Sequence, residues 1–197
     1  MGMEAIILKC PNCGAAVEKG QGKCHYCKKP VVIQSYGDTD GLSVLQLNKY
    51  AAAYRKTLAE IPENREVNTA IGMCYLKLNM YDKAVEAFEK AIQDNFEDSR
   101  PYYWAAVALL QGKKAFVAQR AVIDKVLEYL EAAAMIEPKA IYYYFQAYVK
   151  QDYFERKYLN TTPHYQELLQ MSLDAGMTEE EADAFFEMLG VPRPACL

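Results

Sequence analysis

The chain has few histidines and lacks the common catalytic sequence motifs. Its 197 residues include only two histidines. No Gly-rich phosphate loop, nucleophile elbow or His-x-x-x-His pattern occurs, and no pair of carboxylates has an evident catalytic partner. Because these classes of catalytic motif are missing, we expect a protein that is not an enzyme.

Long apolar runs are also missing. A helix that spans a bilayer needs about 20 consecutive apolar residues, and no stretch of this sequence approaches that length. The apolar letters AIIL near the N-terminus are followed at once by Lys9, so we expect no secretory signal. We therefore expect no membrane association and a cytoplasmic location, where a reducing environment keeps thiols unpaired.

Positive charge is in short supply. The chain has 22 Lys and Arg against 26 Asp and Glu, a net charge of −4. Residues 1–35 hold five Lys and two Glu, a net of +3, which leaves −7 for residues 36–197. A basic stripe with aromatic residues for base stacking is not evident. We expect a protein or peptide partner and not nucleic acid, and the oligomeric state stays open.

What the chain does have is six cysteines, four of them in two C-x-x-C pairs within CPNCGAAVEKGQGKCHYC, residues 10–27. The four are Cys10, Cys13, Cys24 and Cys27. Two such hairpins supply four thiolates that can close a structural Zn²⁺ site, with iron in the same sulfurs as an open alternative. Gly14 follows the first pair, where a positive φ turns backbone N–H groups toward the sulfurs. His25 is expected to be a bystander that faces solvent.

These residues also carry a resemblance. In CPNCG and CHYCKKPV the chain resembles small bacterial zinc ribbons over residues 4–35. The resemblance implies a β-rich ribbon at 1–35 with one structural Zn²⁺ per chain. Four cysteines leave no coordination position open for water, so the site is not expected to be catalytic. We expect the metal to contribute most of the stability of so short a segment.

A short polar stretch separates this segment from a helical body. Residues 36–41 combine turn formers with small polar residues and have no apolar period, which predicts a linker. After it, apolar residues recur every three or four positions until Pro62, which predicts a helix that ends there. The apolar positions of this helix are Leu42, Leu45, Leu47, Tyr50, Ala51, Tyr54 and Leu58.

The segment 64–96 has a more specific pattern. It predicts two antiparallel helices with a break at LNMYD, and its small and aromatic residues recur at the places that a tetratricopeptide repeat requires. The residues at these places are Gly72, Tyr75, Tyr81, Ala84, Phe88 and Ala91. The chain thus resembles tetratricopeptide proteins over 42–160. The fold class that follows is mainly α, a tetratricopeptide-like array of antiparallel helical hairpins with a small N-terminal β-rich zinc ribbon.

The repeats beyond residue 96 match less closely. A second hairpin ends at Pro138, eight residues later than a 34-residue period allows, and the extra residues fall around 113–121. Because no helix breaker occurs there, we expect a longer second helix more than a longer turn. Residues 140–159 resemble a third, degenerate unit with Tyr148 in the Tyr place.

The resemblance to tetratricopeptide repeats also implies a binding groove, lined by the first helix of each hairpin. Its expected wall consists of Thr69, Met73, Leu76, Tyr103, Val107 and Leu110. Thr69 and Met73 occupy places where a carboxylate clamp needs Lys and Asn, so a C-terminal carboxylate is a poor candidate ligand. The sequence favours a protein interaction adaptor, with a nucleic-acid-associated factor as the alternative, in which the ribbon contacts DNA or RNA and the repeats recruit partners.

The last segment, 161–197, is expected to form a helical cap. Thr178 and Glu181 predict a capping box, and Gly190 predicts the helix end. The helix has one apolar stripe, Ala182, Phe185, Phe186 and Leu189, beside which Leu168, Leu169, Met171 and Leu173 are expected to pack. A cap over residues 140–159 is favoured over insertion of this helix into the groove, because repeat arrays need a terminal cap.

Overall fold

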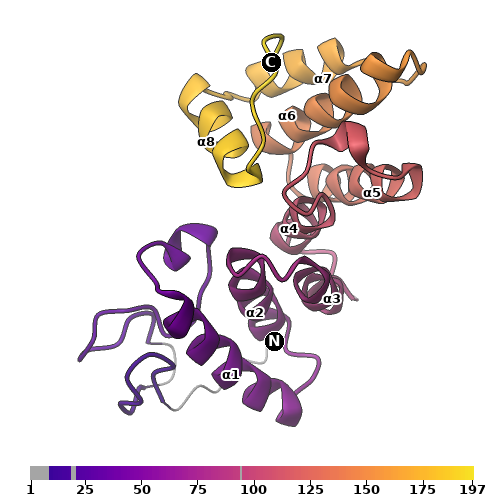
Figure 1. The fold of residues 1–197 in the computed structure, drawn as a ribbon. Helices are drawn as coiled ribbons and strands as arrows, with labels where there is room; N and C mark the ends of the chain where they lie inside the picture. Colours follow the sequence, from indigo (N-terminus) through magenta and orange to yellow (C-terminus); the bar gives the residue numbers. More distant parts are fainter. Residues whose placement is uncertain (1–8, 19–20, 94) are drawn as a thin grey trace. The chain divides into compact units, whose positions relative to one another are not determined.

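The computed structural model describes residues 9–18, 21–93 and 95–197, so part of the predicted ribbon, including residues 1–8, lies outside the described residues. The chain divides into two compact units, Met1–Asn95 and Phe96–Leu197, and each is considered by itself. Regular structure in the described ranges is helical (Figure 1). No helix in those ranges is long and apolar enough to cross a membrane.

The β-rich part of the fold prediction is not supported. The described residues form no strand, and only two isolated antiparallel bridges occur, Lys9 with Ala16 and Lys23 with Pro30. Each bridge closes one C-x-x-C hairpin. A β-strand pair needs several consecutive bridged residue pairs. Each hairpin has only one such pair, so no sheet forms there.

The described residues of the first unit form a short 3₁₀ helix and three α-helices. They are η1 (Tyr36–Thr39), α1 (Val44–Glu60), α2 (Arg65–Lys77) and α3 (Tyr81–Ile92). Ser43 and Gln46 form a reciprocal capping box at the start of α1. This helix ends at Glu60, just before Pro62, as the sequence predicts. η1 occupies most of the predicted linker 36–41. The limits of this linker and of the other predicted domains stay a prediction.

The helices α2 and α3 form an antiparallel hairpin with a tight turn. Asn79 has φ 56°, and the N–H of Met80 donates to the Tyr75 carbonyl, a left-handed helix end that satisfies a free carbonyl. Gly72 on α2 faces Phe88 on α3 so closely that a β-carbon at residue 72 would lie 2.5 Å from the ring. Glycine is therefore required for the two helices to approach this closely.

Gly72→Ala is the direct test of this contact. Three ring atoms would lie within 2.8 Å of the new methyl group, and the ring is fully buried, so the overlap costs up to about 3 kcal/mol. Alanine returns about 1 kcal/mol of helix propensity, so we expect a net loss of about 2 kcal/mol in the free energy of unfolding by urea. Gly37→Ala is the control, because its new methyl group would come no closer than 3.8 Å to any residue other than its two chain neighbours. Equal stability of the two variants would contradict the close approach.

The second unit contains five α-helices among its described residues. They are α4 (Arg100–Leu109), α5 (Arg120–Ile136), α6 (Ala140–Val149), α7 (Tyr165–Asp174) and α8 (Glu179–Leu189). Three short elements accompany them, η2 (Ala115–Val117), the π-helix η3 (Lys150–Phe154) and η4 (Glu155–Lys157). In sequence order α4 packs on α5, α5 on α6 and α6 on α7, which is the neighbour-to-neighbour packing of a repeat array.

The eight extra residues of the second hairpin lengthen both its helix and its turn. α5 has 17 residues whereas α3 has 12, and the turn before α5 contains η2. Two side chains from the next hairpin hold this turn: Tyr148 accepts a hydrogen bond from the Ala115 N–H at 3.2 Å, and Asp152 accepts one from the Phe116 N–H at 2.7 Å. α5 is longer than α3, as predicted, but most of the segment 113–121, which was expected to lengthen the helix, lies in the turn before Arg120.

The bounds of α8 are as predicted. Thr178 and Glu181 form the capping box, and Gly190 ends the helix with φ 68°. The stripe of Ala182, Phe185, Phe186 and Leu189 is buried. Its two phenylalanines contact Tyr144, Phe145 and Tyr148 of α6, with ring centroids 4.9 to 6.2 Å apart.

The prediction for α7 was partly wrong. Leu168 is buried, but Met171 is 44% exposed and Leu173 is 50% exposed. These two side chains therefore do not pack beside the α8 stripe as expected.

Candidate metal centre and groove residues

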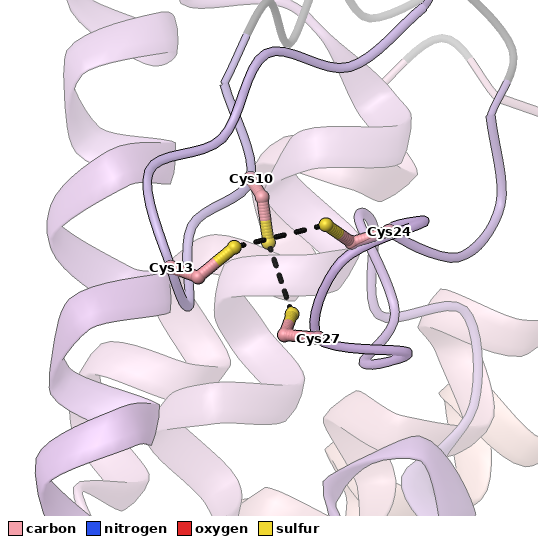
Figure 2. A group of neighbouring side chains, drawn as sticks. All are labelled: Cys10, Cys13, Cys24 and Cys27. Carbon is pink, nitrogen blue, oxygen red and sulfur yellow. Dashed lines mark hydrogen bonds between the residues drawn. The ribbon is translucent and has the colours of Figure 1, made fainter.

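The four cysteines of the C-x-x-C pairs gather at one point. All four Sγ atoms lie within 4.8 Å of one another, with Cys10 to Cys27 at 3.6 Å and Cys13 to Cys24 at 3.7 Å (Figure 2). In a tetrahedral zinc site with Zn–S bonds of about 2.3 Å, the sulfurs are about 3.8 Å apart. The four thiols are unpaired, as are Cys74 and Cys196. Two of the sulfur pairs thus have the spacing of a tetrahedral site, and all four sulfurs are close enough together to hold one metal ion.

The two hairpins that hold these sulfurs have the same backbone geometry. In the first, the N–H of Gly14 donates to the Cys10 carbonyl at 2.8 Å, and in the second the N–H of Lys28 donates to the Cys24 carbonyl at 2.9 Å. Gly14 has φ 76° and Lys28 has φ 60°. The left-handed turn predicted at Gly14 is confirmed, and Lys28 adopts it at the matching place despite its β-carbon.

The surroundings of the Cys10 and Cys27 sulfurs shift the pKa of the two thiols in opposite directions. Burial raises the pKa of the Cys10 thiol to about 12. Burial also raises the pKa of the Cys27 thiol, but hydrogen bonds from the Asn12 side chain and the Lys29 backbone lower it, and the resulting pKa is about 6. N–H donors thus stabilise the thiolate form of Cys27.

Two tyrosines of α1 fasten the segment that follows the second hairpin. The Tyr50 hydroxyl donates to the Pro30 carbonyl at 2.5 Å, and the Tyr54 hydroxyl accepts from the Ile33 N–H at 3.0 Å. Both rings are fully buried. Burial, the largest effect on each phenol, raises the pKa of both. The cysteine segment is thereby joined to the first helix through buried hydrogen bonds.

Two further residues that could bind metal or react, His25 and Cys74, are not part of the sulfur cluster. His25 is exposed, and the cluster of close ligand atoms found in the described ranges does not include it. Cys74 is fully buried in α2, and burial raises the pKa of its thiol to about 12. A buried thiol with a raised pKa is a packing residue and a poor nucleophile.

The six predicted groove residues are all buried. The exposed fraction of their side chains is 8% or less for Thr69, Met73, Leu76, Tyr103, Val107 and Leu110. Three belong to each unit. Tyr103 packs inside the second unit against Tyr142 and Phe145, with ring centroids 5.5 and 6.1 Å apart. Little of their surface is open in this conformation, and their binding role stays a prediction.

Sequence reasoning missed two further features. The Gln46 side chain of α1 donates to the Asn12 side chain in the first C-x-x-C hairpin at 2.9 Å, and the Ser43-x-x-Gln46 capping pattern could have indicated the position of Gln46. The second unit also has a pocket of about 580 Å³, lined in part by Tyr103, Ala140 and Phe185. Its walls come from three separate segments, so no local pattern could have indicated it.

Comparison with known proteins identifies the central hairpin. The family model described as tetratricopeptide repeat matches residues 68–93, which cover most of α2 and α3. No curated protein matches the chain.

Solved structures of MamA resemble a larger part of the chain. A crystal structure of MamA is 17% identical with a TM-score of 0.56, and the match covers 74% of this chain and 77% of that one. A structure of MamA AMB-1 is 21% identical with a TM-score of 0.52, covering 80% and 74%. A structure of MamA MSR-1 is 18% identical with a TM-score of 0.50, covering 66% and 70%. At these identities the resemblance shows the fold, a tetratricopeptide-like array of helices.

Proposed function

We propose that the chain is a non-enzymatic adaptor whose helical hairpins bind a partner protein or peptide. The observation that carries this proposal is the tetratricopeptide hairpin of α2 and α3, followed by further hairpins packed in sequence order. Arrays of this kind present extended surfaces for other proteins. The acidic body and the reduced thiols fit a partner other than nucleic acid and a cytoplasmic location.

The proposal assigns one structural Zn²⁺ to Cys10, Cys13, Cys24 and Cys27. Four sulfurs with the spacing of a tetrahedron fit zinc, the usual occupant of closed Cys₄ sites, and iron is the alternative. Once all four sulfurs bind the ion, no position remains for water or substrate. The ion's role is therefore to hold the two hairpins together.

The proposal assigns partner binding to the six groove residues only if the hairpins rearrange. Because their side chains are buried, a partner reaches them only after local repacking of the hairpins. A partner that binds without repacking contacts the exposed residues around them. We therefore expect binding to respond first to changes at exposed positions of α2 and α4, such as Arg65 and Glu66.

A pull-down with the purified chain tests this function. We expect a protein to be captured in equal amounts before and after nuclease treatment, and to bind again in a titration when it is purified. Loss of capture after nuclease treatment would favour the nucleic-acid alternative. Oligonucleotide binding provides the second measurement: we expect no affinity tighter than about 10 µM at physiological salt, the range of nonspecific phosphate contacts. Submicromolar affinity there would replace the adaptor proposal.

A further inference from the structure

The pocket of about 580 Å³ lies wholly within the second unit. Its walls are the start of α6, the turn between α7 and α8, and one face of α8, and Tyr103 of α4 also lines it. Ligand pockets in proteins typically have volumes of about 300 to 1,000 Å³. The pocket is therefore large enough for more than one side chain of a bound peptide.

The wall formed by α8 is largely apolar. Glu181, Ala184, Phe185 and Met188 line the pocket at the i, i+3, i+4 and i+7 spacing of a single helix face. Ala184 is exposed, and Met188 is half-buried, as is Ile141 of α6 on the neighbouring wall. Apolar side chains thus stay partly uncovered in the pocket after folding, which is typical of a binding surface.

Tyr103 adds a polar group to this apolar pocket. Its ring packs against Tyr142 and Phe145, and only 8% of the residue is exposed. Among the described residues its hydroxyl has no hydrogen-bond partner. A nearly buried hydroxyl without a partner is unfavourable. A ligand with carbonyl or N–H groups can supply the missing partner, and a peptide backbone carries both groups at nearly every residue.

The helices α7 and α8 carry charge of one sign. Residues 165–189 contain seven Asp and Glu and no Lys or Arg. Two of the acids on α8, Glu179 and Asp183, form ion pairs with Arg193 at 2.7 and 3.0 Å. By helical periodicity these two positions lie opposite the face that lines the pocket. Arg193 therefore neutralises the far side of α8 and leaves the acids near the pocket unbalanced.

Three acids of α8 remain without an ion pair in the part of the chain that the structure describes. Glu181 lines the pocket, and the exposed Glu180 and Glu187 share the side of the helix next to it. The basic residue of the pocket, Lys139, forms an ion pair with Glu137 at 2.8 Å. The unbalanced charge is negative, so it attracts a cationic ligand and repels phosphate and carboxylate groups.

We propose that this pocket binds a basic peptide segment of a partner protein, with apolar side chains in the pocket and Lys or Arg beside the carboxylates of Glu180, Glu181 and Glu187. The inference rests on the proposed adaptor function and names the chemistry of its partner. The apolar walls, the Tyr103 hydroxyl and the acidic rim each match a different part of such a peptide. The last helix then has two roles, a cap on α6 and one wall of a binding site.

Sets of short, terminally labelled peptides provide the probe. The first set has two Leu or Phe and four Lys at varied spacing, the second has Glu in place of Lys, and the third has Ser in place of Leu and Phe. Fluorescence anisotropy with the purified full chain measures the affinity for each peptide. We expect the tightest binding in the first set, by at least about tenfold over the other two, because only that set matches both the apolar walls and the charge.

A variant without the rim charge tests the acids. Glu180→Gln, Glu181→Gln and Glu187→Gln are combined, and a glutamine at 181 still accepts from the Thr178 N–H, as a capping box requires. We expect about tenfold weaker binding of the first peptide set at low salt and a smaller difference at high salt, where charges are screened. The matched control combines the same change at Glu128, Glu131 and Glu155, which are exposed and do not line the pocket.

A second variant fills the pocket. Ala184→Trp places a large side chain on its α8 wall at an exposed position, so the helical circular dichroism and the melting temperature should stay close to those of the unmodified chain. We expect at least about tenfold weaker peptide binding, because the apolar anchors lose their space. Gln166→Trp is the control, since residue 166 is exposed on α7 and outside the pocket.

Several outcomes would overturn the inference. These are no binding by the first set, equal affinity across the three sets, or equal losses in the variants and their controls. Self-association of the unmodified chain that Ala184→Trp abolishes would instead assign the pocket to a second copy. A partner protein captured by the chain that binds Ala184→Trp as tightly as the unmodified protein would end this inference but leave the adaptor function standing.

Discussion

Cys24→Ser is expected to leave the purified chain without zinc and its cysteine segment without a stable fold. Cys24 is buried beside the three other sulfurs, and a serine hydroxyl at neutral pH is a poor ligand for zinc. Structural zinc contributes about 10 to 16 kcal/mol to the folding of small zinc-finger peptides, more than the whole stability of many domains. Elemental analysis should find one zinc per unmodified chain and none in the variant.

The loss should extend into α1. Its Tyr50 and Tyr54 hydroxyls are hydrogen-bonded to residues 30 and 33, and without an ordered segment there these buried groups lose their partners. We expect a reduced helical signal and an early melting transition, with the helices of the second unit still folded. Cys196→Ser is the matched control, because that thiol is exposed and outside the cluster. Stoichiometric zinc in Cys24→Ser would contradict the ligand assignment.

The double variant Phe185→Ala, Phe186→Ala is expected to unfold much of the second unit. Each buried Phe→Ala change costs about 3 to 5 kcal/mol, and because the two rings touch, their losses do not simply add. A combined loss of about 5 kcal/mol or more is comparable to the stability of a typical domain. Thermal melting and binding of a hydrophobic dye should show the change, because Tyr144, Phe145 and Tyr148 lose their cover.

Glu187→Ala is the control for this variant, since residue 187 lies on the same helix and is exposed. The same experiment separates the two interpretations of the last helix. If α8 is a plug that a partner displaces from a binding groove, the double variant should melt as the unmodified chain does and bind its partner more tightly. An early transition with aggregation supports the cap.

Local patterns predicted well those features that depend on neighbouring residues. The capping box at Thr178 and the left-handed end at Gly190 fix the bounds of α8, and the spacing of the two C-x-x-C pairs indicated the four cysteines whose sulfurs lie together. The small and aromatic residues at fixed repeat positions also predicted the α2–α3 hairpin. Gly72, at one of these positions, permits the close contact with Phe88.

Other features depend on residues far apart in sequence. The turn before α5 is held by Tyr148 and Asp152, more than 30 residues away, and no periodicity encodes that contact. An apolar stripe shows which face of a helix is apolar, but not how much of it a neighbour covers, which is why Met171 on α7 is half exposed. The burial of the predicted groove residues likewise depends on distant neighbours: Tyr142, for example, packs against Tyr103.

The contact between Gly72 and Phe88 also limits how this hairpin can diverge during evolution. A larger residue at 72 is tolerated only where 88 has become smaller, and a smaller residue at 88 leaves a void that a side chain at 72 can fill. Each single change passes through a destabilised intermediate, whereas the pair together restores packing. Descendants of this sequence should therefore change residues 72 and 88 together and not one at a time.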